Sequence, residues 1–218
     1  MKRFLPMILL ALALPFGALA DSNNQVDFGN SNGTLKGTNA GLTLTGSTLV
    51  LVNGYDGLGK ITGNDLGTIN FSTGALISGT VYSGGVFAGG GSFQISTNGT
   101  QGLPNGVIFT GSFSGPVDWT LHNLGNGNYD YTLSGPVSGT LIENGQNISV
   151  VGFTIQLTVS ATKGHGPDWN SITIASGNTT FTPVPEPGTL GLLGTGLLGV
   201  AALVRHKWKT GKTGLRST

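Results

Sequence analysis

One stretch of the chain gathers side chains suited to binding a ligand. Residues 163–169, Lys-Gly-His-Gly-Pro-Asp-Trp, follow a strongly alternating segment. Trp169 offers a flat face to a sugar ring, Asp168 can accept hydrogen bonds from sugar hydroxyls, and His165 lies beside them. Such residues are often carried on loops held by a rigid scaffold. The sequence therefore permits a carbohydrate-binding loop. The alternative, which we favour, is a long connection whose Trp169 packs back over the end of the domain.

The same loop makes a poor catalytic centre. No second carboxylate or base accompanies it, and between the two ends of the chain the only other histidine is His122. The chain has no Gly-x-Ser-x-Gly nucleophile elbow, and its acids do not suggest the facing pair that a glycosidase needs. It also has no cysteine, which excludes thiolate zinc sites. We expect a non-enzymatic protein without catalytic residues, metal site or cofactor, with a secreted hydrolase as the remaining enzymatic alternative.

The net charge of residues 21–184 narrows the classes of molecule that the protein is expected to bind. Residues 21–184 hold three lysines and eight acids, a net charge of 3 − 8 = −5, although the whole chain carries +1. An acidic segment without a basic stripe argues against nucleic-acid binding. A weakly charged surface rich in Ser, Thr and Asn is suited to hydrogen bonding with neutral polymers such as polysaccharides.

The N-terminus has the three parts of a secretory signal peptide. A basic start (residues 1–3) precedes an apolar run (residues 4–17), and Ala18 and Ala20 form a small-x-small cleavage site before Asp21. We predict a signal peptide over residues 1–20 and export through Sec-type machinery.

A second apolar segment lies near the C-terminus. Residues 188–204 number 17 (204 − 188 + 1), the short end of the transmembrane range of ~17–25 residues. The basic cluster of Arg205, Lys207 and Lys209 follows it. Basic residues on one side predict a transmembrane helix with a cytoplasmic tail at residues 210–218, and with the preceding part of the chain outside.

Pro185-Glu186-Pro187 stands directly before this segment. A proline-bracketed acid, one apolar helix and a basic cluster, in that order over residues 185–209, resemble the C-terminal sorting signal of PEP-CTERM proteins. The resemblance implies processing at Pro185, Glu186 and Pro187 by an exosortase, a membrane-embedded enzyme. It also implies a place at the cell envelope, surface or extracellular matrix, in association with exopolysaccharide or biofilm. Whether the helix is removed or kept as an anchor stays open.

Between the two ends the pattern is that of β-strands. Apolar and polar residues alternate along residues 151–160, 117–122 and 129–133, a period of two typical of half-buried strands. No segment of residues 21–184 shows a helical apolar stripe. Trp119, Tyr129 and Tyr131 share the parity of apolar neighbours, so we expect core aromatics rather than a sugar-stacking platform.

Turn signals separate these strands. Asn-Gly pairs favour type I′ hairpin turns, and Asn126-Gly127 and Asn144-Gly145 are the best placed. Ser-Gly-Pro-Val occurs at residues 114–117 and 134–137, which predicts two similar strand beginnings with each proline at the first residue or on an edge. We predict an all-β exported domain over residues 21–184, an antiparallel sandwich or jelly roll. A β-solenoid is the alternative, although no fixed repeat runs through the domain.

Overall fold

The structure, a computed structural model, describes residues 25–159, 161–162, 169–184, 194–197 and 199–200. A compact unit, Asn24–Val184, contains every strand described. In chain order the elements are β1 (Val26–Ser31), β2 (Thr34–Thr38), β3 (Gly41–Asn53), a 3-10 turn η1 (Tyr55–Gly57), β4 (Lys60–Ser72), β5 (Leu76–Thr80), β6 (Gly84–Phe87), β7 (Gly90–Asn98), β8 (Asn105–Phe113), β9 (Val117–Gly125), β10 (Asn128–Glu143), β11 (Gln146–Thr158), β12 (Ala161–Thr162) and β13 (Trp169–Pro183).

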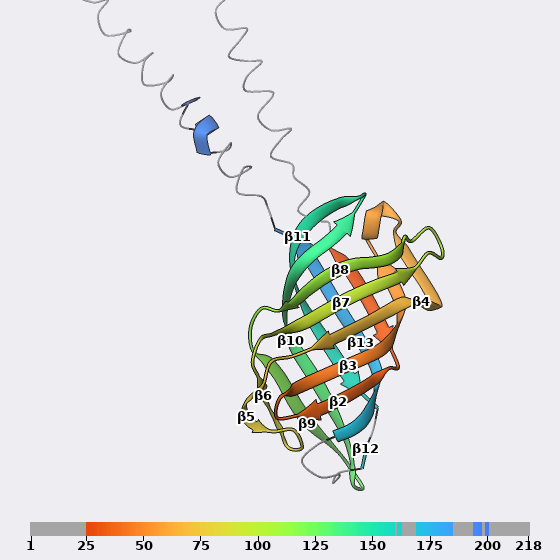
Figure 1. The fold of residues 1–218 in the computed structure, drawn as a ribbon, viewed down its shortest axis with the longest axis vertical. Helices are drawn as coiled ribbons and strands as arrows, with labels where there is room; N and C mark the ends of the chain where they lie inside the picture. The colour runs from red at the N-terminus through yellow and green to blue at the C-terminus, as the bar shows by residue number, and fades with distance from the viewer. Residues whose placement is uncertain (1–24, 160, 163–168, 185–193, 198, 201–218) are drawn as a thin grey trace, which may run out of the picture. The chain divides into compact units, whose positions relative to one another are not determined.

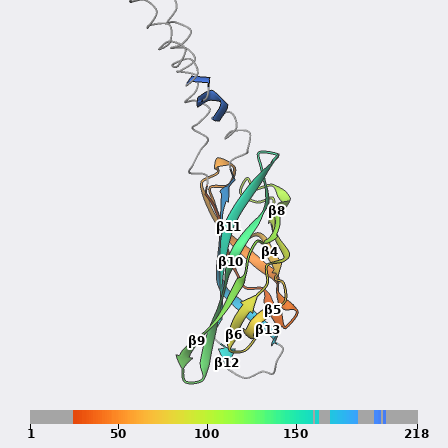
Figure 2. The same ribbon diagram turned by 90° about the vertical axis from the view of Figure 1, so that its left-hand side faces the viewer.

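The strands form one antiparallel sheet whose pairings close on themselves. From β1 the path runs through β3, β4, β7, β8, β10, β11 and β13 and returns to β1 (Figure 1). Seen from the side, β10 and β11 lie in one layer and β4 and β8 in the other (Figure 2). At one end β2 joins β3 and β13, and β9, β6 and β5 continue from β10. The predicted antiparallel all-β class is confirmed. The solenoid alternative is wrong, because the described pairings are antiparallel.

The two predicted hairpin tips are confirmed. Asn126 and Gly127 have φ of 52° and 77°, and Asn144 and Gly145 have φ of 50° and 71°. Left-handed values at both central positions define the type I′ turn, which Asn and Gly adopt most easily. These turns join β9 to β10 and β10 to β11, the longest stretch of hairpin structure in the domain.

The second Ser-Gly-Pro-Val repeat was predicted to begin a strand, and this is wrong. Pro116 does lie just before β9, but Pro136 lies inside β10. There β10 exchanges one neighbour for another: its residues up to Ser134 pair with β9, and those from Val137 pair with β8. Proline has no N–H to donate, and its carbonyl accepts a bond from the Ser114 amide (3.0 Å). The switch between partners therefore tolerates a proline in the strand interior.

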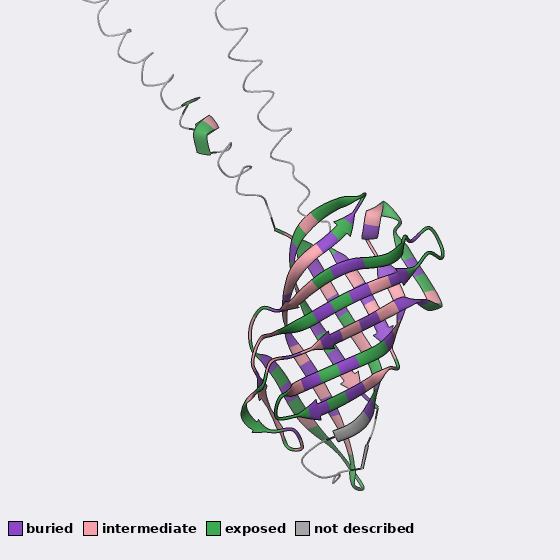
Figure 3. Ribbon diagram, viewed as in Figure 1, coloured by how far each residue is buried: buried purple, intermediate pink, exposed green. Residues whose placement is uncertain are grey.

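Large apolar side chains fill the space between the layers, as the alternating burial along the strands shows (Figure 3). Phe71 stacks on Phe93 with ring centroids 5.4 Å apart. Phe109 of β8 stacks on Phe181 of β13 at 4.2 Å, which ties the two layers together. Offset and edge-to-face arrangements such as these stabilise beyond simple area burial. The core thus combines stacked aromatic rings with a larger number of aliphatic side chains.

The polar side of β11 faces the core, although the other side of the strand carries large apolar residues. Val151, Phe153 and Ile155 are 50%, 47% and 50% exposed, whereas Thr154 and Gln156 are fully buried. The alternation of residues 151–160 predicted a half-buried strand correctly, and the structure places the polar side of that strand inward. The polar side is inside because it has hydrogen-bonding partners there.

Those partners form a buried polar network. Asn30 and Gln156 exchange two bonds: Asn30 Nδ2 donates to Gln156 Oε1 (2.7 Å) and Gln156 Nε2 donates to Asn30 Oδ1 (3.2 Å). Asn30 also donates to Ser47 Oγ (2.7 Å), and Gln156 to Thr154 Oγ1 (3.0 Å), which in turn lies 2.8 Å from Thr179 Oγ1. The network joins β1, β3, β11 and β13. Buried polar groups cost little when they are all paired in this way.

Replacing Gln156 with alanine tests this network. Gln156→Ala leaves the Asn30 amide buried without its main partner, so we expect the free energy of unfolding to fall by about 2–3 kcal/mol. Gln94→Ala on β7 is the matched control, since Gln94 is exposed and should change stability by less than about 0.5 kcal/mol. Chemical denaturation measures both. Equal stability of the two variants would contradict the role given to the network.

Candidate functional site

Residues 163–168 of the predicted ligand loop lie outside the described residues. Its start is fixed by Ala161–Thr162, which pairs with Asn128 and Tyr129 of β10. Its end is fixed by the backbone of Trp169, which lies opposite Gly37 of β2. His165 and Asp168 lie outside the described residues, as does the side chain of Trp169. The ligand-binding role of these three residues therefore stays a prediction.

One histidine, His122, lies within the described part of the chain. His122 is exposed on β9 and its Nε2 lies 3.0 Å from Thr132 Oγ1. Within the described part of the chain, no three His, Cys, Asp or Glu residues lie close enough to hold a metal ion.

The side chains of Asp56 and Glu143 hold backbone amides at a place that sequence reasoning missed. Glu143 Oε1 accepts a bond from the Asp56 amide (2.8 Å), and Asp56 Oδ1 accepts one from the Asn144 amide (2.6 Å). The Tyr55 hydroxyl adds a bond to the Ile142 carbonyl (2.6 Å). These bonds clamp η1 onto the turn between β10 and β11. No local signal reveals the pairing, because the partners are 87 and 88 residues apart.

The surroundings of Tyr55 in this clamp change the pKa of its hydroxyl. Burial, followed by the nearby charges of Asp56 and Glu143, raises the pKa of Tyr55 to about 12. Burial, with a smaller effect of Tyr129, raises the pKa of Tyr131 to about 12 as well. Both phenols stay protonated at neutral pH and act as hydrogen-bond donors, not as bases.

The aromatic residues of β9 and β10 belong to the core, as predicted. Trp119 and Tyr131 are 1% and 3% exposed, and their rings stack at 4.8 Å. Trp119 Nε1 donates to the Val81 carbonyl (2.8 Å) and the Tyr131 hydroxyl to the Tyr82 carbonyl (2.6 Å). Tyr129 is partly buried against the same core. Because both faces are covered, Trp119 and Tyr131 offer no surface to a sugar ring.

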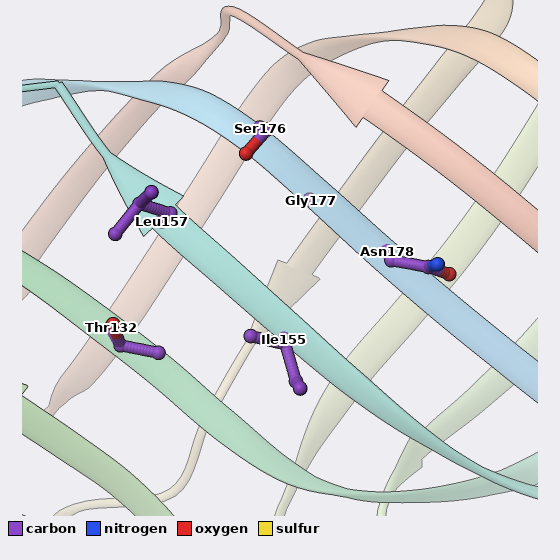
Figure 4. A pocket seen from close by; sticks show the side chains of 6 residues that line it. All are labelled: Thr132, Ile155, Leu157, Ser176, Gly177 and Asn178. Atoms are coloured by element: carbon purple, nitrogen blue, oxygen red, sulfur yellow. The ribbon is translucent and has the colours of Figure 1, made fainter.

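One hollow opens on the outer face of β10, β11 and β13 (Figure 4). It measures about 430 Å³. Ile155 and Leu157 of β11 form its apolar wall, and a side chain at Gly177 would point to the opposite, buried side of β13. Its full lining is Thr132, Ile155, Leu157, Ser176, Gly177 and Asn178. The lining carries no charged group, so the hollow is suited to an uncharged, largely apolar occupant.

The last strand of the domain directly precedes the sorting segment in the sequence. Pro183, the final residue of β13, lies opposite Val150 of β11, and the Val184 amide donates to the Ser149 carbonyl (2.8 Å). Residues 194–197 and 199–200 are helical. Among the described residues, no helix combines the length and the hydrophobicity that crossing a membrane requires.

The predicted processing and cleavage residues lie outside the described part of the chain, so their roles stay predictions. They are Ala18, Ala20, Asp21, Pro185, Glu186, Pro187, Arg205, Lys207 and Lys209.

Comparison with known families identifies a sequence motif at the C-terminal end of the chain. Residues 183–206 match the family model of the PEP-CTERM protein-sorting motif. The chain carries a PEP-CTERM sorting motif. Comparison with curated proteins and with solved structures finds no match. The motif identifies the chain as an exported protein sorted to the cell surface or envelope by an exosortase-type system, and it leaves the role of the β-domain to be inferred.

The raised pKa values of the two tyrosines predict how the stability of the β-domain depends on pH. Unfolded tyrosines lose their proton near pH 10, whereas Tyr55 and Tyr131 hold theirs up to about 12. The folded state therefore binds more protons over this interval, and the free energy of unfolding should fall as the pH rises from about 10 to 12. Tyr55→Phe should make this fall shallower. Denaturation at several pH values measures it, and a flat profile for the wild type would contradict the assignment.

Proposed function

We propose that the β-domain is a non-enzymatic component of the cell surface or extracellular matrix, associated with exopolysaccharide. The observation that carries the proposal is the sorting motif, which begins at the last residue of the final strand. Sorting delivers the whole β-domain to the outside of the cell. A protein delivered in this way meets the polymers of the matrix first.

The hydrogen bonds of Asp56 and Glu143 support a structural role for the β-domain. Asp56 and Glu143 each accept a bond from a backbone amide. A glycosidase would need one such group free to donate a proton and another free to act as nucleophile or base. In this domain the two groups fasten a turn instead.

The surface supports contact with neutral polymers. Outward positions of β10 and β13 carry mainly hydroxyl and amide side chains, among them Ser138, Asn178 and Thr182. Such groups exchange hydrogen bonds with sugar hydroxyls without needing an ion pair. The negative net charge of residues 21–184 also favours neutral polysaccharides over acidic ones.

The mass of the mature protein from its native host tests the sorting step. We expect loss of residues 1–20 and a C-terminus produced at the Pro185-Glu186-Pro187 element. Glu186→Ala should leave the C-terminal segment attached, because the acid of the motif is removed. Asp118→Ala, which changes an exposed acid of β9, is the control and should mature normally. Loss of the same C-terminal residues from the wild type and from Glu186→Ala would argue against recognition of this element.

Binding to the host's own exopolysaccharide tests the association. The mature protein should co-sediment with the polymer, and Trp169→Ala should weaken binding up to about tenfold, the loss of one stacking contact. Leu124→Ala removes an exposed side chain of β9 (54% exposed) and should leave binding unchanged. A wild type that stays in the supernatant would refute the association. Equal binding by Trp169→Ala would remove Trp169 from the contact.

A further inference from the structure

The last residues of β13 belong both to the sheet and to the sorting motif. The motif match covers residues 183–206, whereas β13 extends to Pro183, and the Val184 amide still donates to the Ser149 carbonyl (2.8 Å). The first two residues of the motif are therefore held in the folded domain. An enzyme that binds them as an extended peptide competes with β11 for their backbone.

β13 loses one of its two neighbouring strands just before this end. It pairs with β1 as far as Phe181 and with β11 as far as Pro183, so in the described structure residues 182–184 have a paired strand on one side only. Thr182 and Val184 are exposed, and Pro183 has no N–H to donate. One-sided pairing and few buried contacts are features of chain ends that open at low free-energy cost.

Phe181 marks the point where such opening stops. Its side chain is fully buried, and its ring stacks on Phe109 with the centroids 4.2 Å apart and lies edge-on to Phe28 at 6.0 Å. Releasing Phe181 would expose this ring to water and break the pairing with Val26 as well. Residues 182–184 can thus leave the sheet while the core stays closed.

Release of these residues changes how far the chain can reach. From Val184 held in the sheet, the two residues that lead to Glu186 span at most roughly 7 Å. From Phe181, the five residues that lead to Glu186 span roughly 17 Å. A membrane-embedded enzyme is built from helices or a closed barrel, and one helix is about 10 Å thick. Release therefore gives Glu186 the reach to pass one such layer, which the closed sheet does not.

We propose that Thr182, Pro183 and Val184 leave β11 before the processing enzyme acts, and that processing of the folded domain requires this release. The inference rests on the proposed function, because it takes Pro185-Glu186-Pro187 as the processing site. It adds a requirement inside the β-domain, at residues that the sheet holds until they are released.

A disulfide across the end of the β11–β13 ladder tests the release. Ser149 and Val184 are joined by a backbone hydrogen bond, and both are exposed. Antiparallel residues paired in this way have Cα atoms about 5.5 Å apart, a distance that a disulfide bridges. The natural chain has no cysteine, so Ser149→Cys with Val184→Cys forms a single bridge that holds residue 184 on β11.

We expect the oxidised bridge to slow C-terminal processing roughly tenfold or more, because processing follows the population of the open end. A thiol reductant should restore the rate in the same variant, which controls for the change at Val184. Intact mass after a pulse of synthesis in the native host measures the rate, and alkylation of free thiols marks the chains without a bridge.

A second bridge on the same ladder is the matched control. Ile155 and Asn178 are also partners on β11 and β13, and both are exposed. At this position β13 is paired with β1 as well, through Gly29. Ile155→Cys with Asn178→Cys therefore joins the same two strands without holding the end of β13. It should be processed at the wild-type rate in both redox states.

A spacer separates lost reach from damage to the domain. Inserting Gly-Ser-Gly-Ser between Val184 and Pro185 of the bridged chain lengthens the path to Glu186 to six residues, roughly 20 Å when extended. A flexible linker of this kind should restore processing although the bridge remains. A bridge that acted by damaging the fold would block processing with or without the spacer.

The outcomes distinguish this inference from the proposed function. Wild-type processing of Glu186→Ala would refute the processing element, and the inference would fail with it. Blocked processing of Glu186→Ala together with equal rates for the bridged and reduced forms of the Ser149→Cys, Val184→Cys variant would keep the element and refute the release from β11. Failure of the spacer to restore processing would also overturn the inference.

Discussion

The pair of side-chain amides formed by Asn30 and Gln156 fixes the register of β11, and much of the domain depends on that register. A shift by one residue would turn Phe153 and Ile155 inward, which burial of apolar surface alone favours. It would also leave the side-chain amide of Asn30 inside the protein without Gln156, at a cost of about 1–3 kcal/mol. Gly177 contributes to the outcome, because a Cβ there would meet the amide oxygens of Gln156 and Asn30. The space beside β11 is thus shaped for amides.

The sequence predicts the strands and hairpins of this domain better than it predicts their faces. Asn126-Gly127 and Asn144-Gly145 are local signals, because the two residues of each turn determine its backbone shape. The alternation along β11 is local too, but a period of two looks the same whichever side is buried. The deciding partner of Gln156 lies 126 residues away. Pro136 was misplaced for a similar reason, since the change of neighbours along β10 depends on distant strands.

The candidate functional sites also differ in how far the sequence predicts them. A sorting motif is recognised as a linear order of residues, so the sequence reveals it without a fold. The clamp between Asp56 and Glu143 exists only once η1 and the β10–β11 turn are brought together. The sequence does not show that each of these acids would hold a backbone amide of the other's turn. Long-range polar contacts of this kind are the part of the structure that a single sequence conceals.

Closure of the sheet has a consequence for the order of events during export. Val26 of β1 pairs with Phe181 of β13, so the first strand cannot complete its pairing until the last one is available. Contacts so distant in sequence form slowly, and the edge of β1 that faces β13 remains unpaired until β13 is in place. β13 ends at Pro183, where the sorting motif begins. The strand that completes the sheet therefore directly precedes the sorting motif in the sequence, and removal of the motif after Pro183 would leave the closed sheet intact.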